Sequence, residues 1–332
     1  MNKKTKTIFF VIGIVVFIFL IYNFGIDNII LNVQKTGWWF VPIISIWGIV
    51  YYINAWAWYF IIGDKNISFA EIFSITLSGF AINYITPVIN LGGEPYRILA
   101  LKNSLGLNTS VSSTILYSII HFLSHFIFWL TAIILMSVFS PLSDLLKVAF
   151  AIVSIMLAAI IYFFISHHKK GILFALYKTT TKIPFLKKFS GKLKSKESSI
   201  LNIDKEISSF YNERRSEFFK SLSLDYLARL IASVEFYFIL RSIGVEISIL
   251  EAIYISAGTS LILNILFFMP FELGTRETSI MLIMDGLKYI SAIGVYVGLV
   301  NRIREFFWIL IGLVLIQLHK QKTADKKVLE SI

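Results

Sequence analysis

The sequence predicts an all-α, polytopic membrane helix bundle with about 7–9 hydrophobic segments, two of them broken, re-entrant helical units. Of the 332 residues, 57% are hydrophobic and only 15% are charged, whereas roughly a quarter of the residues of a soluble domain are charged. Uncharged runs such as 8–24, 40–62, 114–139 and 148–166 approach or exceed the ~20 residues that a helix needs to cross a bilayer. We therefore expect one integral membrane domain over residues 1–332.

The first half of this domain, 8–166, begins with spans at 8–24 and about 38–62, and we place its N-terminus in the cytoplasm. An ordinary crossing by the next apolar run would leave the basic segment 167–220 outside, although Lys and Arg favour the cytoplasmic side. A re-entrant unit at 69–110 removes this conflict, because it enters from the cytoplasm and returns to it. Pro87, Asn90 and the Gly92-Gly93 pair within it are typical of a helix break.

The second half, 221–318, contains another broken unit and ends at a basic tail, which we also place in the cytoplasm. Its segments in chain order are a span at about 221–243, a broken unit at 249–284 interrupted at 270–274, runs at 278–300 and 303–318, and the tail 319–332. Asp285-Gly286 is typical of a turn or bend. Either three ordinary spans or a re-entrant pair followed by one long, bent span satisfies this topology.

The two broken units resemble each other. Each opens with Ser-x-x-Glu, at Ser68 and Ser248, which is a capping box that satisfies the free amides of a helix start. Each continues through an apolar run with Gly and Asn to Pro, and then to Leu-Gly followed by charges. Because the first unit begins inside and the second outside, we expect an inverted repeat, which is a common plan of secondary transporters.

The net charge of +11 is concentrated at the predicted cytoplasmic side, in 1–7, 167–220 and 319–332. This location predicts contact with anionic inner-leaflet lipids and not with nucleic acid. The 167–220 segment also holds apolar residues at near-helical spacing, namely Ile200, Ile203, Ile207, Phe210 and Phe218. They indicate either an amphipathic helix on the inner leaflet or a helix packed on the protein's own cytoplasmic face.

Several kinds of chemistry are excluded or disfavoured. The absence of cysteine excludes disulfides, cysteine-ligated metals and cysteine nucleophiles, and no Walker-type phosphate loop is present. His121 and His125 have the spacing of metal ligands on a helix, but no third ligand accompanies them. We expect no metal and no cofactor, and the role of these two histidines stays open.

Charged residues inside the apolar segments are the candidates for function, because each costs about 2.5–3.5 kcal/mol on insertion scales. They gather at the two breaks, where an arginine fork and the amides of a helix start suit a phosphate-bearing headgroup. The candidate substrate-binding residues are Gly92, Gly93, Glu94, Arg97, Glu272, Gly274, Arg276, Glu277 and Arg302. The alternative is that the charges pair only with one another, and we favour it for Arg229 and Arg302.

The motifs Leu-Gly-Gly-Glu-Pro-Tyr-Arg, ending at Arg97, and Pro-Phe-Glu-Leu-Gly-Thr-Arg-Glu, ending at Glu277, resemble the lysylphosphatidylglycerol synthase transmembrane region, or flippase-like domain family. The likeness spans about 8–318. The second motif of this family usually reads Pro-Gly-Gly-x-Gly-x-Arg-Glu, so Phe271 and Glu272 stand where two glycines are usual.

The resemblance implies a lipid flippase or transporter of a bacterial inner membrane, with a phospholipid or a polyprenyl-phosphate-linked lipid as substrate. In its best-known relatives a separate cytosolic domain makes the aminoacylated lipid. The few residues after Leu318 leave no room for that domain, so synthetase activity is not expected. The alternatives are a membrane-embedded transferase or accessory subunit in lipid or lipid-linked glycan synthesis, and a scaffold. An envelope-synthesis enzyme or a second copy of the chain is the expected protein partner.

Overall fold

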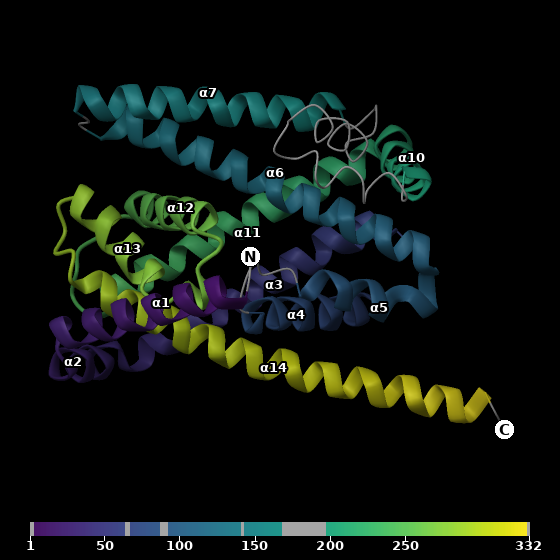
Figure 1. The fold of residues 1–332 in the computed structure, drawn as a ribbon, viewed down its shortest axis with the longest axis horizontal. Helices are drawn as coiled ribbons and strands as arrows, with labels where there is room; N and C mark the ends of the chain where they lie inside the picture. Colours follow the sequence, from purple (N-terminus) through teal and green to yellow (C-terminus); the bar gives the residue numbers. More distant parts are fainter. Residues whose placement is uncertain (1–2, 64–66, 87–91, 141–142, 168–196, 331–332) are drawn as a thin grey trace. The chain divides into compact units, whose positions relative to one another are not determined.

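The computed structural model describes residues 3–63, 67–86, 92–140, 143–167 and 197–330, and these residues form helices and turns without any strand (Figure 1). The long helices are α1 Lys3–Phe24, α3 Phe40–Ile62, α6 Leu107–Phe139, α7 Asp144–His167, α11 Arg215–Ser242 and α14 Ile293–Glu330. The shorter ones are α2 Ile26–Thr36, η1 Gly37–Trp39, α4 Phe69–Ile85, α5 Gly93–Leu105, α10 Glu197–Glu213, α12 Ile249–Ile265, η3 Pro270–Glu272 and α13 Thr275–Gly286.

Apolar helices of membrane-spanning length confirm the predicted fold class. Ile26–Ile62, Leu107–Phe139 and Asp144–Ser166 are long and apolar enough to cross a bilayer, and Phe10–Phe24, Phe69–Ile85 and Ile249–Ile265 are shorter apolar helices. Only 6% of the most apolar window of α7 is buried within the protein. An apolar helix exposed in this way is stable in hydrocarbon and not in water.

The two broken units have nearly the same dimensions. The 17-residue α4 precedes the 13-residue α5, and the 17-residue α12 precedes the 12-residue α13. Ser248 and Glu251 form the predicted capping box, and the Glu71 amide donates to the Ser68 hydroxyl at 3.2 Å. Pro87 and Asn90, on which the prediction of the first break depends, lie outside the described residues.

The prediction of separate runs at 278–300 and 303–318 is wrong. Helix α13 ends at Gly286, as the Asp-Gly pair indicated, and one helix runs from Ile293 through the charged residues around Arg302 to Glu330. Lys288 has φ 64°, so the reversal between the helices falls there. The charged residues Arg302, Arg304 and Glu305 of α14 are paired with residues of α11 and α13 and lie within the continuous helix. The broken unit is thus followed by one long helix in place of two separate runs.

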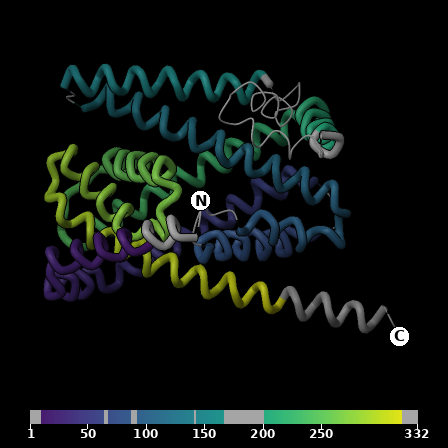
Figure 2. Tube along the Cα trace, in the orientation of Figure 1, coloured from purple at the N-terminus to yellow at the C-terminus, as the bar shows by residue number. Residues whose placement is uncertain are grey.

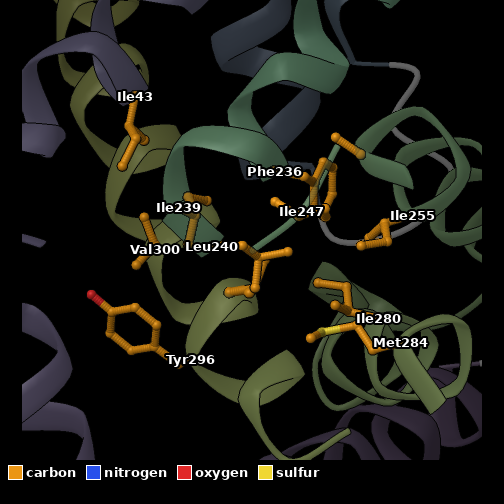
Figure 3. Close-up of a cluster of buried hydrophobic side chains, with 12 residues drawn as sticks. Ile43, Phe236, Ile239, Leu240, Ile247, Ile255, Ile280, Met284, Tyr296 and Val300 are labelled. Atoms are coloured by element: carbon orange, nitrogen blue, oxygen red, sulfur yellow. The ribbon is translucent and has the colours of Figure 1, made fainter. Parts of the chain in front are cut away.

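The described chain falls into two compact units. The first comprises 1–52, 73–96 and 228–332, and the second comprises 53–72 and 97–227. The core of the first unit joins α3, α11, α12, α13 and α14 (Figure 3). Its fully buried members include Ile239, Ile255, Ile280, Met284 and Tyr296.

Small residues let the helices of the first unit approach closely. A Cβ on Gly298 of α14 would lie 2.9 Å from the side chain of Glu277, and one on Gly312 would lie 2.4 Å from Ala81 of α4. The Ser78 hydroxyl of α4 also donates to the Gly312 carbonyl at 3.2 Å. Helix α14 therefore packs against both α13 and α4.

The turn between α13 and α14 is held by Tyr289. Its hydroxyl donates to the Glu251 carboxylate at 2.7 Å and lies 3.2 Å from the Glu246 carbonyl. Burial and this hydrogen bond to the carboxylate raise the pKa of Tyr289 to about 12.

In the second unit, α6 and α7 form an antiparallel helical hairpin (Figures 1 and 2). Helix α10 also packs on α6, and its Ile207 and Tyr211 are buried. Of the two arrangements predicted for the apolar residues of 167–220, this contact agrees with the one in which the helix packs on the protein itself. Arg214, between α10 and α11, donates to the Phe60 and Ile61 carbonyls at 2.8 and 3.1 Å and so satisfies the end of α3.

Candidate functional site

The second helix break, between α12 and α13, has an unusual backbone. Phe271 and Glu272 have φ of 55° and 53°, and Gly274 has φ of 72°. A left-handed conformation costs a residue with a side chain about 1–2 kcal/mol, whereas glycine adopts it readily. Phe271 and Glu272 thus adopt a left-handed conformation that favours glycine, and glycine is the usual residue at both positions in the family motif that this segment resembles.

Arg302 of α14 holds this strained turn. Its guanidinium donates to the Phe271 carbonyl at 3.2 Å and to the Glu272 carbonyl at 3.1 Å. It also bonds both oxygens of the Glu277 carboxylate, at 2.9 and 3.3 Å, and Glu277 is fully buried. Arg302 therefore ties the break and the start of α13 to α14.

Arg276 lies between two carboxylates. Its Nε donates to Glu272 at 3.1 Å, and its Nη1 lies 2.7 Å from a carboxylate oxygen of Glu305 on α14. The Arg276 side chain is 9% exposed. A phosphate that bound Arg276 would have to displace one of these carboxylates.

A third arginine extends the cluster toward α11. Arg304 bonds both oxygens of Glu235, at 3.0 and 3.1 Å, and the Trp47 indole donates to Glu235 at 2.7 Å. The Arg304 guanidinium lies over the Trp47 ring at 3.6 Å and 3.9 Å from Glu305. The cluster thus pairs Arg276, Arg302 and Arg304 with Glu235, Glu272, Glu277 and Glu305, which leaves one more carboxylate than guanidinium.

At the first break, the start of α5 lies against α4. The Gly93 amide donates to the Asn83 side-chain carbonyl at 2.6 Å, and Asn83 lies 3.5 Å from the Glu94 carboxylate. A Cβ on Gly93 would lie 2.2 Å from the Gly79 carbonyl oxygen, and one on Gly92 would lie 2.1 Å from Thr86. Both glycines are therefore required by close packing, and Asn83 satisfies backbone freed by the break.

Arg97 belongs to the second unit and is 2% exposed. Its guanidinium lies 5.5 Å from the centre of the Trp58 ring and 5.2 Å from that of Tyr117. Contacts of this kind stabilise a buried cation through the negative faces of the rings.

One helical turn beyond Tyr117, His121 meets an acidic residue of α11. Its Nδ1 lies 2.9 Å from Asp225, which also accepts a short hydrogen bond from Ser124. The His125 ring lies 5.3 Å from the His121 ring, edge to face. In the part of the chain that the structure describes, no group of three or more His, Asp or Glu side chains has the arrangement of a metal site.

The structure brings together Glu272, Gly274, Arg276, Glu277 and Arg302 around the second break, and it places Gly92, Gly93 and Glu94 at the first break. The sequence left open the alternative that the charged residues pair with one another. The structure shows such pairs for Arg276 with Glu272 and for Arg302 with Glu277. The sequence reasoning missed Trp47 and Asp225. An acidic residue inside the predicted span 221–243 was the signal that could have identified Asp225.

Comparison with known proteins gave one family. Residues 7–312 match the family described as Lysylphosphatidylglycerol synthase TM region. Neither the curated proteins nor the solved structures gave a match.

Proposed function

Because the chain belongs to the lysylphosphatidylglycerol synthase transmembrane-region family, a family of membrane proteins with a lipid-related function, we propose that it is a lipid flippase or transporter. It moves a phosphate-bearing lipid, aminoacylated or polyprenyl-linked, between the two leaflets of the bacterial inner membrane. Both termini face the cytoplasm, where the basic segments meet anionic lipid headgroups.

The observation that carries this proposal is the cluster of buried ion pairs at the second helix break. Ionisable groups within a membrane protein are costly and commonly mark a substrate or ion pathway. Here Arg276 is held by two carboxylates from different helices, Glu272 and Glu305. A guanidinium with two partners can exchange one of them for a phosphate and keep the other.

The first break is followed by a second arginine, Arg97, which we propose as a separate phosphate-binding group. Arg97 is a buried cation beside the rings of Trp58 and Tyr117, and an arginine fork is the group that binds phosphate with two hydrogen bonds. Glu94 and Glu277 position the arginines or bind a cationic part of the headgroup. The nearly equal lengths of the two broken units support an inverted repeat, whose halves alternate access to the two sides of the membrane.

The test is leaflet exchange in liposomes that contain the purified protein. A panel of labelled phospholipids and polyprenyl phosphates is compared for the wild type, Arg97→Lys and Arg276→Lys, because lysine keeps the charge but loses the bidentate fork. The exposed Arg215 provides the matched control, Arg215→Lys. Exchange that both site variants lose and the control keeps supports the proposal.

Absence of exchange for every lipid, with folded wild-type protein, would refute the flippase and favour a transferase or a scaffold. Exchange that survives in both site variants would retain the transporter but refute the role of the two arginines.

A further inference from the structure

The second unit contains a titratable pair, His121 and Asp225, whose residues are not among those of the proposed lipid site. His121 lies fourteen residues into the 33-residue helix α6, which is about 20 Å along its axis at ~1.5 Å per residue. Its partner Asp225 is fully buried, whereas the His121 side chain is 28% exposed. The pair is thus in the middle of an apolar helix of spanning length, and the imidazole is the member that a proton can reach.

The hydrogen bonds around Asp225 accommodate two protonation states. The Ser124 hydroxyl lies within bonding distance of Asp225 and also 3.1 Å from the His121 carbonyl, and it has one hydrogen to donate. When the Asp225 carboxylate is ionised, the Ser124 hydroxyl donates to it. When Asp225 is protonated, Asp225 donates to the Ser124 oxygen, and the Ser124 hydroxyl donates to the His121 carbonyl. The His121 Nδ1–H can bond the other carboxylate oxygen, which leaves Nε2 to gain or lose a proton.

Charged and titratable residues lie on the elements next to this pair. They include His125 on α6, Arg97 on α5 beside Tyr117, the buried Asp204 on α10, and Arg229, which follows Asp225 by one turn on α11. Neither 53–62 of α3 nor 148–166 of α7 contains a charged residue. Because Asp225 is buried and α6 is an apolar helix, a change in the net charge of the pair has a larger effect here than it would in water.

We propose that His121 and Asp225 form a proton-binding site, and that proton uptake there is coupled to lipid movement. The coupling rests on the proposed function, whereas the proton site does not. A proton from water adds to the pair and returns to water, so no other reactant is needed. Uptake changes the charge buried between α6 and α11, which favours one arrangement of these helices over another.

The proton site is tested by magnetic resonance of histidine labelled with ¹³C and ¹⁵N, in protein held in lipid nanodiscs. The five histidines are assigned with His121→Gln and His125→Gln. We expect the His121 ring to change protonation between about pH 5 and pH 8, where imidazoles exchange their proton. We expect Asp225→Asn to shift that transition. A His121 ring whose signals do not change over this range would overturn the proton site.

The coupling is tested by measuring lipid exchange across the same pH range. Beyond the midpoint we expect the wild-type rate to change about tenfold per pH unit. We expect His121→Gln and Asp225→Asn to abolish this dependence and His125→Gln, the matched control, to retain it. A pH profile of His121→Gln identical to that of the wild type would overturn the coupling. Absence of exchange at every pH would refute the proposed function and with it the coupling, and the histidine titration would still decide the proton site.

Discussion

Removal of Glu235 tests the energetics of the ion-pair cluster most directly. Arg304 is 4% exposed and Glu235 is 1% exposed, and two hydrogen bonds of 3.0 and 3.1 Å join them. In Glu235→Leu the Arg304 guanidinium keeps only the more distant carboxylate of Glu305, at 3.9 Å. Loss of one partner from a buried ion pair costs about 3–5 kcal/mol. We therefore expect the midpoint of thermal unfolding to fall by roughly 5–15 °C.

The assay is thermal unfolding in detergent, followed by tryptophan fluorescence. A double variant, Glu235→Leu with Arg304→Met, separates the charge from the packing, because replacement of both members of a buried pair is often neutral or stabilising. The matched control is Asp144→Ala. The Asp144–Lys147 pair has a similar distance of 3.0 Å but lies on the surface, so its loss should leave the midpoint unchanged.

Two results would refute this reasoning. A Glu235→Leu variant as stable as the wild type would mean that the pair does not hold α11 to α14. A double variant as unstable as the single one would mean that the loss arises from packing and not from an unpaired charge.

Three further predictions concern the turns and helix ends. Gly93→Ala should destabilise the protein, because the added Cβ would lie 2.2 Å from a backbone oxygen. Gly286→Ala should be tolerated, because its Cβ would have no atom within 4 Å. The midpoints of thermal unfolding of the two variants check this. The raised pKa of Tyr289, about 12 against the ordinary 10.0, contributes stability that is present below pH 10 and is lost as the pH rises through 12. The unfolding midpoint of Tyr289→Phe should therefore fall less steeply than that of the wild type over this alkaline range, and parallel curves would contradict the assignment. Arg214→Ala should accelerate hydrogen exchange in the last turn of α3, since it removes the donors to the carbonyls there, and Arg215→Ala should not.

The helix breaks were predictable from sequence because their causes are local. Pro270 and Gly274, four residues apart after an apolar run, favour a helix break, and Asp285-Gly286 ends α13 as expected. The left-handed backbone at Phe271 was not predictable, because a bulky residue adopts it only where tertiary contacts impose it. Here the imposing contact is Arg302, which lies 31 residues further along the chain.

The pairing of the charges was not predictable either. Periodicity identifies which segments are apolar, and it does not indicate which charge meets which across the bundle. Glu235 and Arg304 are 69 residues apart, and His121 and Asp225 are 104 apart. Each of these contacts is set by packing of whole helices, so a single sequence indicates only that the charges need partners.

Helix α14 has a consequence that reaches beyond its own contacts. It is one continuous helix, and it meets the second break through Arg302 and, about three turns later, the helix before the first break through Gly312. A continuous helix transmits displacement along its axis, because its backbone hydrogen bonds resist stretching. A translation or rotation of α14 would therefore displace the residues at both breaks at the same time.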